Sequence, residues 1–375
     1  DERVIYKKKM LSAQQEYEDT KDKKYLKLIS RYNNIQMARK ISLNSAYGAI
    51  GNQWFRYYDK AIAEGITKSG QLSIRWIENK LNKYLNNILK TNDDYVIASD
   101  TDSVYLTMDK LVTETIKSDN VLSKTINFLD KVASESIEPY ITKSYDELKQ
   151  YTNAFANKMF MKREVIADKG IWVAKKRYIL NVWNSEGISY NESKLKIMGI
   201  EAVKSSTPAM CRAKIKDALE LIMTRDEQEL NQFIRTFREE FLNVNPELIS
   251  FPRSVKGLSK YFDSGTTFKK STPMHVKGAL IYNHKVKQNK LINKYPLIQE
   301  GDKIKFVYLK QPNPFTSNVI TFMTKLPKEF NIHSFVDYET QFEKVFVEPL
   351  TLILNTIRWS VDRTYGTQGT LEDFF

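Results

Sequence analysis

The spacing of apolar residues divides the first third of the chain into helices. In residues 1–32 apolar side chains recur every three or four positions within polar sequence, which predicts one long helix. Asn33-Asn34 is expected to interrupt that helix, and residues 35–52 predict a second one, closed by Gly48 and Gly51. Two antiparallel helices therefore fit residues 1–50. Residues 61–90 show the same period and predict a third helix.

The pattern then alternates between strands and helices. Two β-rich runs, YVIAS and SVYLTM, flank the polar DTD of residues 100–102, which predicts a hairpin with acidic residues at its turn. The pattern predicts a helix over 121–160, strands over 162–184 and 193–199, and helical structure again over 207–242. We expect short strands and turns over 250–330 and a last helix over 335–358. The chain contains no internal repeat, and the pattern predicts an α+β protein.

Composition narrows the class of protein. The 375 residues suffice for two or three domains with their own cores. One cysteine, Cys211, excludes an intramolecular disulfide and a cysteine-rich zinc site, and its apolar surroundings favour a core position over a nucleophile. A reducing, cytoplasmic location fits this usage. No run approaches the ~18 apolar residues of a membrane helix, and no secretory signal is visible, so no membrane partner is expected.

The distribution of charge indicates the kind of partner. The net charge is +13, and residues 251–310 contain 13 Lys and Arg against 3 Asp and Glu. Residues 1–40 contain 11 basic and 6 acidic residues. Two basic regions far apart in the sequence favour a polyanion held between two elements. The alternative is a solvated lysine-rich surface, and composition alone does not separate the two.

The sharpest chemical signal is SDTDSVY. Asp100 and Asp102 are two residues apart, and strand alternation would place both carboxylates on one side. Two carboxylates that close repel each other unless a cation lies between them, and oxygen ligands on a rigid turn suit Mg²⁺. An ordinary Asp-rich turn is the alternative interpretation.

A second signal is RKISLNSAYG. On a helix, Lys40, Asn44 and Tyr47 fall at i, i+4 and i+7 and form one stripe. A cation, an amide and a phenol on one face could meet a phosphate, a sugar edge and a base. Without further context, an ordinary amphipathic helix explains the same residues.

Together and in this order, the two signals resemble one family. KxxxNSxYG followed by a strand–DTDS–strand hairpin resembles motifs B and C of the family B DNA polymerases. WVAKKRYIL resembles their later KKRY element, and LKIMGIEAVKSSTP resembles the palm-to-thumb junction of the T-even-type phage replicative enzymes. QPNPF before a long helix resembles the end of their thumb. The resemblance covers nearly the whole chain.

The resemblance implies roles for matching residues. Asp100, Asp102 and the palm carboxylate Glu164 would hold the metals, and Lys40 would contact the triphosphate as a catalytic residue. The remaining dNTP-binding residues would be Arg3, Lys7, Asn44, Tyr47 and Gly48, where Arg3 and Lys7 rest on spacing alone. The primer strand would be held by Lys175, Lys176, Arg177 and Tyr178, and the thumb lysines Lys285, Lys287 and Lys290 would follow the duplex phosphates.

The family also implies an architecture and a reaction. We expect the right-hand polymerase fold, with an antiparallel palm sheet, helical fingers and a mixed α/β thumb. Its parts would be fingers over 1–51, palm over 52–196, thumb over 197–363 and a tail over 364–375. The reaction would transfer a nucleotide from a dNTP to the 3′-hydroxyl of primer–template DNA, with two Mg²⁺ ions as cofactors.

The extreme C-terminus carries a separate signal. Gln368, Leu371, Phe374 and Phe375 spell QxxLxxFF, which resembles a sliding-clamp-binding peptide. On a single helical turn Leu371 and Phe374 would share one face, and the aromatic pair would fill a pocket on the clamp. A frayed amphipathic end is the alternative interpretation.

The family pattern is incomplete in this sequence. Motif A, a DxxSLYP segment with the other metal-binding aspartate, does not occur, and neither does the DxE motif of the 3′–5′ exonuclease. We therefore expect an N-terminal polymerase part, carrying motif A and the exonuclease, as a partner. The sequence is compatible both with the C-terminal piece of a split polymerase and with a truncated reading of a longer gene. Two other readings are a catalytically silent DNA-binding subunit that tethers a partner to the clamp, and an unrelated Mg²⁺-dependent phosphotransferase.

Overall fold

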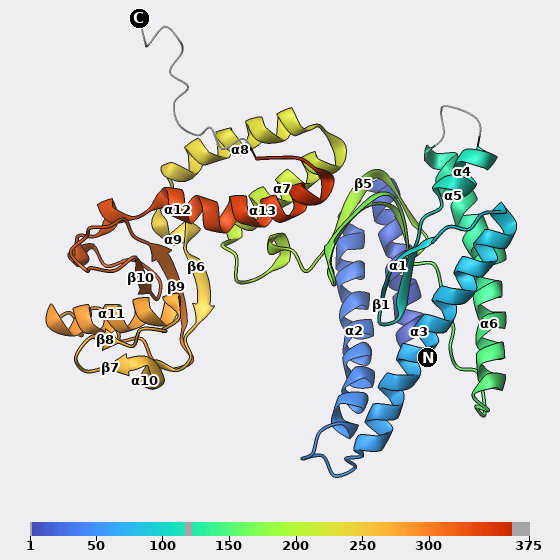
Figure 1. Cartoon of the computed structure of the whole chain (residues 1–375), viewed down its shortest axis with the longest axis horizontal. Coiled ribbons are helices and arrows are strands. Elements are labelled where there is room, and N and C mark those ends of the chain that lie inside the picture. The colour runs from blue at the N-terminus through green and yellow to red at the C-terminus, as the bar shows by residue number, and fades with distance from the viewer. Residues whose placement is uncertain (1, 117–121, 362–375) are drawn as a thin grey trace, which may run out of the picture. The chain divides into compact units, whose positions relative to one another are not determined.

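The computed structural model describes residues 2–116 and 122–361, which form two compact units (Figure 1). Unit 1 takes the chain up to Lys169 together with Asn181–Lys194, and unit 2 takes Gly170–Leu180 and the chain from Leu195 onward. Helices predominate in both units and are combined with small sheets, which confirms the α+β class. No described helix has the length and apolar character needed to cross a membrane.

Unit 1 opens with a helical hairpin. Helix α1 (Glu2–Thr20) and helix α2 (Lys24–Ile50) run antiparallel. Residues at the start of α1 contact the later part of α2, and residues near the end of α1 contact the start of α2. Glu2 pairs with Arg39 at 2.9 Å, the rings of Tyr6 and Tyr32 lie 6.1 Å apart, and the Tyr25 hydroxyl donates to Glu16 at 3.3 Å. The two expected antiparallel helices are thus confirmed.

The expected boundary between these helices was wrong. The chain turns at Lys21, which adopts a φ of 54°, and Asp22 accepts a hydrogen bond from the backbone of Lys24 at the start of α2. Asn33 lies within α2, where its side chain accepts from Gln36 one turn later at 2.8 Å. Gly48 is also helical, and only Gly51 closes the helix. The side-chain hydrogen bond of Asn33 thus lies within the helix and does not interrupt it.

Helix α3 (Lys60–Leu89) and a hairpin build the small core of unit 1. The Asp59 side chain caps α3 by accepting from the backbone of Ala61 and Ile62. Strands β1 (Val96–Asp100) and β2 (Ser103–Leu106) pair antiparallel as predicted, and the short helix α4 (Asp109–Thr115) follows. The core contains Ile77, Leu81, Val96, Ile141, Tyr145 and Leu148.

The predicted helix over 121–160 contains a π-helical turn next to a proline and ends early. Helix α5 (Leu122–Val132) passes through one π-helical turn (Ala133–Ile137) into α6 (Glu138–Tyr151), which has Pro139 at its start. Proline cannot donate the usual backbone hydrogen bond, and a π turn accommodates that loss without ending the helix. Residues 152–164 form no regular element, so the predicted helix extends too far.

A three-stranded sheet follows, in the order β3-β4-β5. Its strands are β3 (Val165–Ala174), β4 (Arg177–Ser185) and β5 (Ile188–Met198). The links between them have two residues each, and connections that short join antiparallel strands. The strands predicted over 162–184 and 193–199 are confirmed, with the KKRY element at the β3–β4 turn.

The larger core of unit 2 joins helices from distant parts of the sequence. Helices α7 (Ala209–Thr224) and α8 (Glu227–Leu242) pack with the C-terminal helices α12 (Tyr338–Phe342) and α13 (Glu348–Leu354). A second Glu-Pro step, at Pro349, again follows a π-helical turn (Glu343–Val347). Cys211 is fully buried here, and burial raises the pKa of its thiol to about 12, so the expected core role is confirmed.

A second layer of unit 2 places one helix on a sheet. Strands β6 (Phe251–Ser254), β9 (Lys303–Tyr308) and β10 (Val319–Phe322) form an antiparallel sheet in the order β10-β9-β6. Helix α11 (Met274–Gln288) packs on it, although only strands and turns were expected over 250–330. Other short elements are the helices α9 (Pro246–Ile249) and α10 (Leu258–Tyr261) and the strands β7 (Phe262–Asp263) and β8 (Thr267–Phe268).

Candidate active site

The DTD motif forms the tight turn between β1 and β2. Asp100 is the last residue of β1 and pairs with Ser103 across a two-residue turn of Thr101 and Asp102. Thr101 has a φ of 56°, which is rare for a β-branched residue and costs roughly 1–3 kcal/mol. Because Thr101 is left-handed, strand alternation does not extend to Asp102, and that reason for grouping the two carboxylates was wrong. Backbone strain at this point is typical of a functional turn.

The two carboxylates of the turn have different surroundings. The Asp100 carboxylate is half-buried and accepts from the Thr101 hydroxyl at 3.0 Å. Asp102 is exposed, and its carboxylate makes no hydrogen bond or ion pair within the described part of the chain. The exposed Asp102 carboxylate and the half-buried Asp100 carboxylate on a short, strained turn suit a hard cation that also keeps water and substrate ligands. The donor set therefore fits Mg²⁺.

Glu164 is not part of a complete set of metal ligands among the described residues. It is exposed immediately before β3, and its carbonyl accepts from the Glu186 backbone at 2.7 Å. Across residues 2–116 and 122–361, no three carboxylate, histidine or cysteine side chains gather closely enough to hold a metal. The structure therefore does not bring Glu164 together with Asp100 and Asp102 in one cluster. The metal role of Glu164 stays a prediction.

The Lys40–Asn44–Tyr47 stripe faces solvent along α2. All three side chains are exposed, as is every residue from Met37 to Gly48. Gly48 leaves room beside the stripe, since a Cβ there would meet no atom within 4 Å. The stripe is open to a ligand along its whole length.

The two cations predicted on α1 have unequal surroundings. The Lys7 ammonium pairs with Glu186 of the β4–β5 turn at 2.5 Å. Arg3 is half-buried, and its Nε finds no hydrogen-bond partner among the described residues. Sequence reasoning missed Glu186, because no local pattern around it indicates a contact with a helix 179 positions earlier in the chain. A phosphate contact by Lys7 would have to replace this ion pair.

The KKRY turn presents two lysines outward and holds its other members inside. Lys175 and Lys176 are exposed between β3 and β4, whereas Tyr178 is only 7% exposed and stacks on Trp172. Arg177 is held by Glu201 at 2.8 Å. The structure thus separates the four predicted primer-strand residues into an exposed pair and an inner pair.

Gly199 explains how this turn is held. It ends the LKIMG segment with a φ of +65°, and a Cβ there would lie 2.2 Å from the Lys176 carbonyl oxygen. Only glycine allows both the left-handed backbone and so close an approach. The KKRY and LKIMG elements, recognised separately in the sequence, therefore pack against each other.

Comparison with known proteins settles the family. The model of DNA polymerase family B matches residues 1–357. The chain belongs to the family B DNA polymerases. The DNA-directed DNA polymerase of Escherichia phage RB69 is 39% identical over 330 residues, which are 84% of this chain and 36% of the relative.

The other relatives agree with this family. The DNA-directed DNA polymerase of Enterobacteria phage T4 is 36% identical over 335 residues, 85% of this chain and 36% of the relative. A DNA polymerase of Methanocaldococcus jannaschii is 22% identical over 88% of this chain and 17% of its own length. The resemblance to T-even-type phage polymerases is confirmed. The chain spans about a third of the length of the phage polymerases that it matches.

In this family B chain, the three lysines predicted to follow the duplex phosphates lie around the end of α11. Lys285 and Lys287 occupy the last turn of the helix, where cations interact favourably with the helix dipole. The Lys285 ammonium lies 5.1 Å from the Phe315 ring, and Lys287 and Lys290 are exposed. Part of the lysine-rich region 251–310 is thus exposed at the C-terminal end of α11.

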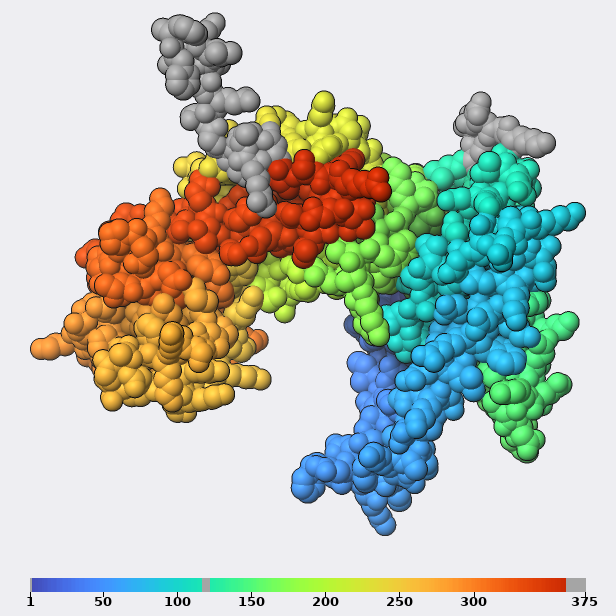
Figure 2. Space-filling model, viewed as in Figure 1, coloured from blue at the N-terminus to red at the C-terminus, as the bar shows by residue number. Residues whose placement is uncertain are grey.

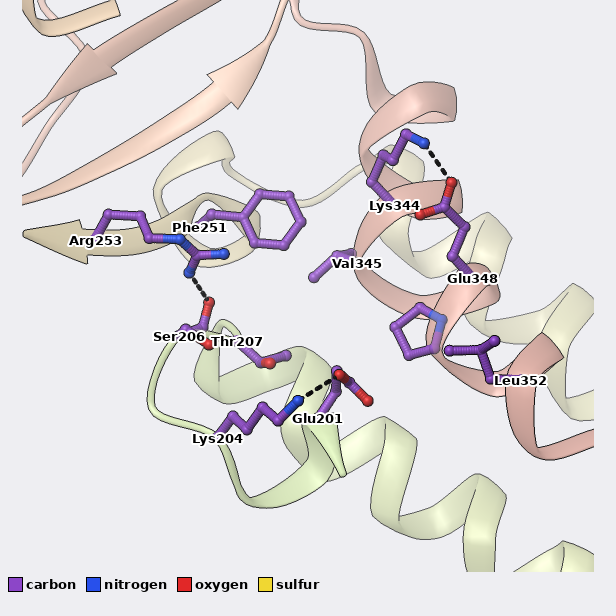
Figure 3. A pocket seen from close by; sticks show the side chains of 11 residues that line it. Glu201, Lys204, Ser206, Thr207, Phe251, Arg253, Lys344, Val345, Glu348 and Leu352 are labelled. Carbon is purple, nitrogen blue, oxygen red and sulfur yellow. Dashed lines mark hydrogen bonds and ion pairs between the residues drawn. The ribbon is translucent and has the colours of Figure 1, made fainter. Parts of the chain in front are cut away.

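A cavity of about 350 Å³ lies inside unit 2 (Figure 3). Its charged lining groups are mostly matched with one another. Lys204 pairs with Glu201 at 2.8 Å, Lys344 pairs with Glu348, and the Arg253 guanidinium donates to the Ser206 carbonyl at 2.6 Å. Burial lowers the pKa of Arg253. Internal pairing of this kind is typical of a structural junction.

The clamp-binding residues predicted at the C-terminus lie outside the described residues. They are Gln368, Leu371, Phe374 and Phe375.

Proposed function

We propose that this chain is the motif B, motif C and thumb part of a replicative DNA polymerase and performs DNA-directed DNA synthesis together with a part that carries motif A. The observation that carries the proposal is the strained DTD turn between β1 and β2, in a chain that a family B model matches over residues 1–357. The phage relatives at 36–39% identity are named DNA-directed DNA polymerases.

The described residues divide the work of nucleotidyl transfer. Asp100 and Asp102 supply carboxylate ligands for Mg²⁺, which when bound stabilises charge on the attacking and leaving oxygens. Lys40 offers an exposed cation to the triphosphate, and Asn44 and Tyr47 offer an amide and a phenol to the nascent base pair. Positioning and charge, rather than covalent chemistry, are what the protein contributes to phosphoryl transfer.

The partners and layout follow from the same proposal. Fingers over 1–51, palm over 52–196 and thumb over 197–363 would form the right-hand arrangement around primer–template DNA and a dNTP. Glu164, Arg3 and Lys7 join the site in this proposal once the N-terminal part is present. The host cytoplasm is the compartment in which we expect the enzyme to act.

Primer extension tests the proposed function. The chain and a polypeptide carrying the preceding polymerase part, with its DxxSLYP segment, should together extend a primed template in the presence of Mg²⁺ and dNTPs. The chain by itself should extend it negligibly, because the metal-binding aspartate of motif A belongs to the other part. A complex that binds primer–template DNA but never extends it would instead support the silent tethering subunit.

Substitution of Lys40 should separate nucleotide use from DNA binding. We expect Lys40→Ala to raise the apparent KM for dNTPs, lower the rate, or both, because the variant has no exposed cation next to the triphosphate. Neutralising Lys285, Lys287 and Lys290 should instead weaken DNA binding and flatten its salt dependence, by roughly 0.9 in slope for each phosphate that the thumb no longer neutralises. Lys131→Ala, at an exposed lysine outside these sites, is the matched control. An equal decrease of DNA affinity in both variants would contradict this division.

Removal of the C-terminal peptide should uncouple the polymerase from a sliding clamp. We expect deletion of residues 368–375 to leave synthesis on a short template unchanged and to abolish stimulation by the cognate clamp. Phe374→Ala should remove most of that stimulation, since an anchoring aromatic contributes about 2 kcal/mol or more. Processivity on a long primed template, with and without clamp, measures the effect. A deletion variant stimulated as strongly as the full chain would place the clamp contact elsewhere.

A further inference from the structure

Exposed apolar side chains are concentrated in one part of this molecule. Among the described residues, unit 1 carries all the large exposed hydrophobic side chains except six. The two units are of similar size, so size does not explain the difference. The six exceptions in unit 2 are Met198, Val203, Leu248, Phe262, Ile292 and Leu352.

The exposed residues of unit 1 gather on a helical arm formed by residues 37–72. No residue in this range is buried, although it includes the second half of α2 and the first half of α3. The turn between the two helices projects from the rest of unit 1 as the blue tip in Figure 2. Trp54 is 86% exposed and Tyr57 67% exposed at this turn. A helix pair without a covered apolar face is marginally stable in water.

The amphipathic stripe of α3 shows which face lacks a partner. Ile62 and Ile66 begin a row at helical spacing that continues through Ser73, Ile77 and Leu81. The structure buries the later members, and Ile77 and Leu81 are fully inaccessible. Ile62 and Ile66 remain 53% and 48% exposed. One face of α3 is thus buried over its second half and bare over its first, where it carries Ile62 and Ile66.

A second bare apolar segment lies in the same unit. Tyr151 at the end of α6 and Phe155, Met159 and Phe160 in the irregular stretch before β3 are 45% to 103% exposed. Several large apolar side chains exposed within one short segment, unlike scattered single ones, are typical of an interface. Two such segments in unit 1, against scattered single residues in unit 2, indicate a large partner.

We propose that the first half of α3, through Ile62 and Ile66, is the docking surface for the polymerase part that carries motif A. This inference rests on the proposed function. The chain corresponds to only 36% of each phage polymerase, so roughly two thirds of such an enzyme is polypeptide that could cover the arm. That part would extend the apolar face of α3 in the way Ile141 and Tyr145 already cover its second half.

Hydrogen exchange of the backbone amides of residues 60–72 tests the proposal. In this chain by itself these amides should be weakly protected, as in a helix that opens often, whereas the amides of residues 77–85 should stay protected. Addition of the motif A part, as a separate polypeptide or joined to this chain, should slow exchange over 60–72 by about a hundredfold or more.

Two variants make the test specific. The double change Ile62→Lys with Ile66→Lys should leave the fold of the isolated chain intact, because both side chains are already exposed. It should abolish the protection of residues 60–72 by the partner. Thr67→Lys with Gln71→Lys adds the same charge on the opposite face of α3 at exposed polar positions and should retain the protection.

The outcomes separate this proposal from its alternatives. Protection that grows with the concentration of this chain by itself would make the occupant a second copy, and protection only by DNA would make it nucleic acid. Either result, or equal behaviour of the two double variants, overturns the proposal. A complex that protects residues 60–72 yet synthesises no DNA would refute the proposed function and leave the docking surface standing.

Discussion

Asp102→Asn should reduce primer extension by on the order of a thousandfold in the complex with the motif A part. The substitution keeps the shape of the side chain and removes its negative charge, so one Mg²⁺ loses a charged ligand. Decreases of a hundredfold to a thousandfold are usual when one preorganised electrostatic contact to a transition state is removed. Asp102 is the more exposed of the two turn carboxylates and has no partner among the described residues, so its charge is available for a metal.

The same variant should leave DNA binding almost unchanged. The carboxylate repels the phosphate backbone, so its removal cannot weaken a phosphate contact. Asp109→Asn, an exposed carboxylate in the first turn of α4, changes the net charge equally and serves as the control. Single-turnover extension and a filter-binding titration measure the two quantities. Near-normal extension by Asp102→Asn would show that the DTD turn does not hold the catalytic metal.

The elements with strong periodicity or turn chemistry could be predicted from the sequence. The β1–β2 hairpin, helix α3 and the β3–β4–β5 strands follow patterns set by nearby residues. The structure places Asp100 and Asp102 at the predicted turn for the same reason. Cys211 is buried, as its apolar surroundings indicated.

The features that sequence reasoning missed depend on distant partners. Helix α11 contains Gly278, which argues against a helix locally. A Cβ at Gly278 would lie 2.4 Å from the Thr321 hydroxyl oxygen, so the glycine allows the helix to approach β10 closely. The ion pair of Lys7 with Glu186 joins residues 179 positions apart. Neither contact leaves a local pattern.

A further large effect is expected where two sequence motifs meet. Gly199→Ala should lower the stability of unit 2 by about 3 kcal/mol, through two separate costs. An alanine with a φ of +65° is strained, and its Cβ would lie 2.2 Å from the Lys176 carbonyl oxygen and 3.1 Å from the Arg177 Cγ. The nearest atom is backbone, so the KKRY turn has to move. Displacement of Lys175 and Lys176 should also weaken primer–template binding.

Gly301→Ala separates these two costs within the same unit. Gly301 of unit 2 has a φ of +87°, but a Cβ there would meet no atom within 4 Å, so only backbone strain applies. For a unit of this size, each kcal/mol lowers the melting temperature by roughly 2–4 °C, so thermal unfolding resolves the difference between the variants. DNA affinity should fall for Gly199→Ala and stay unchanged for Gly301→Ala. Equal effects of the two substitutions on both measurements would show that the contact between Gly199 and Lys176 does not position the turn.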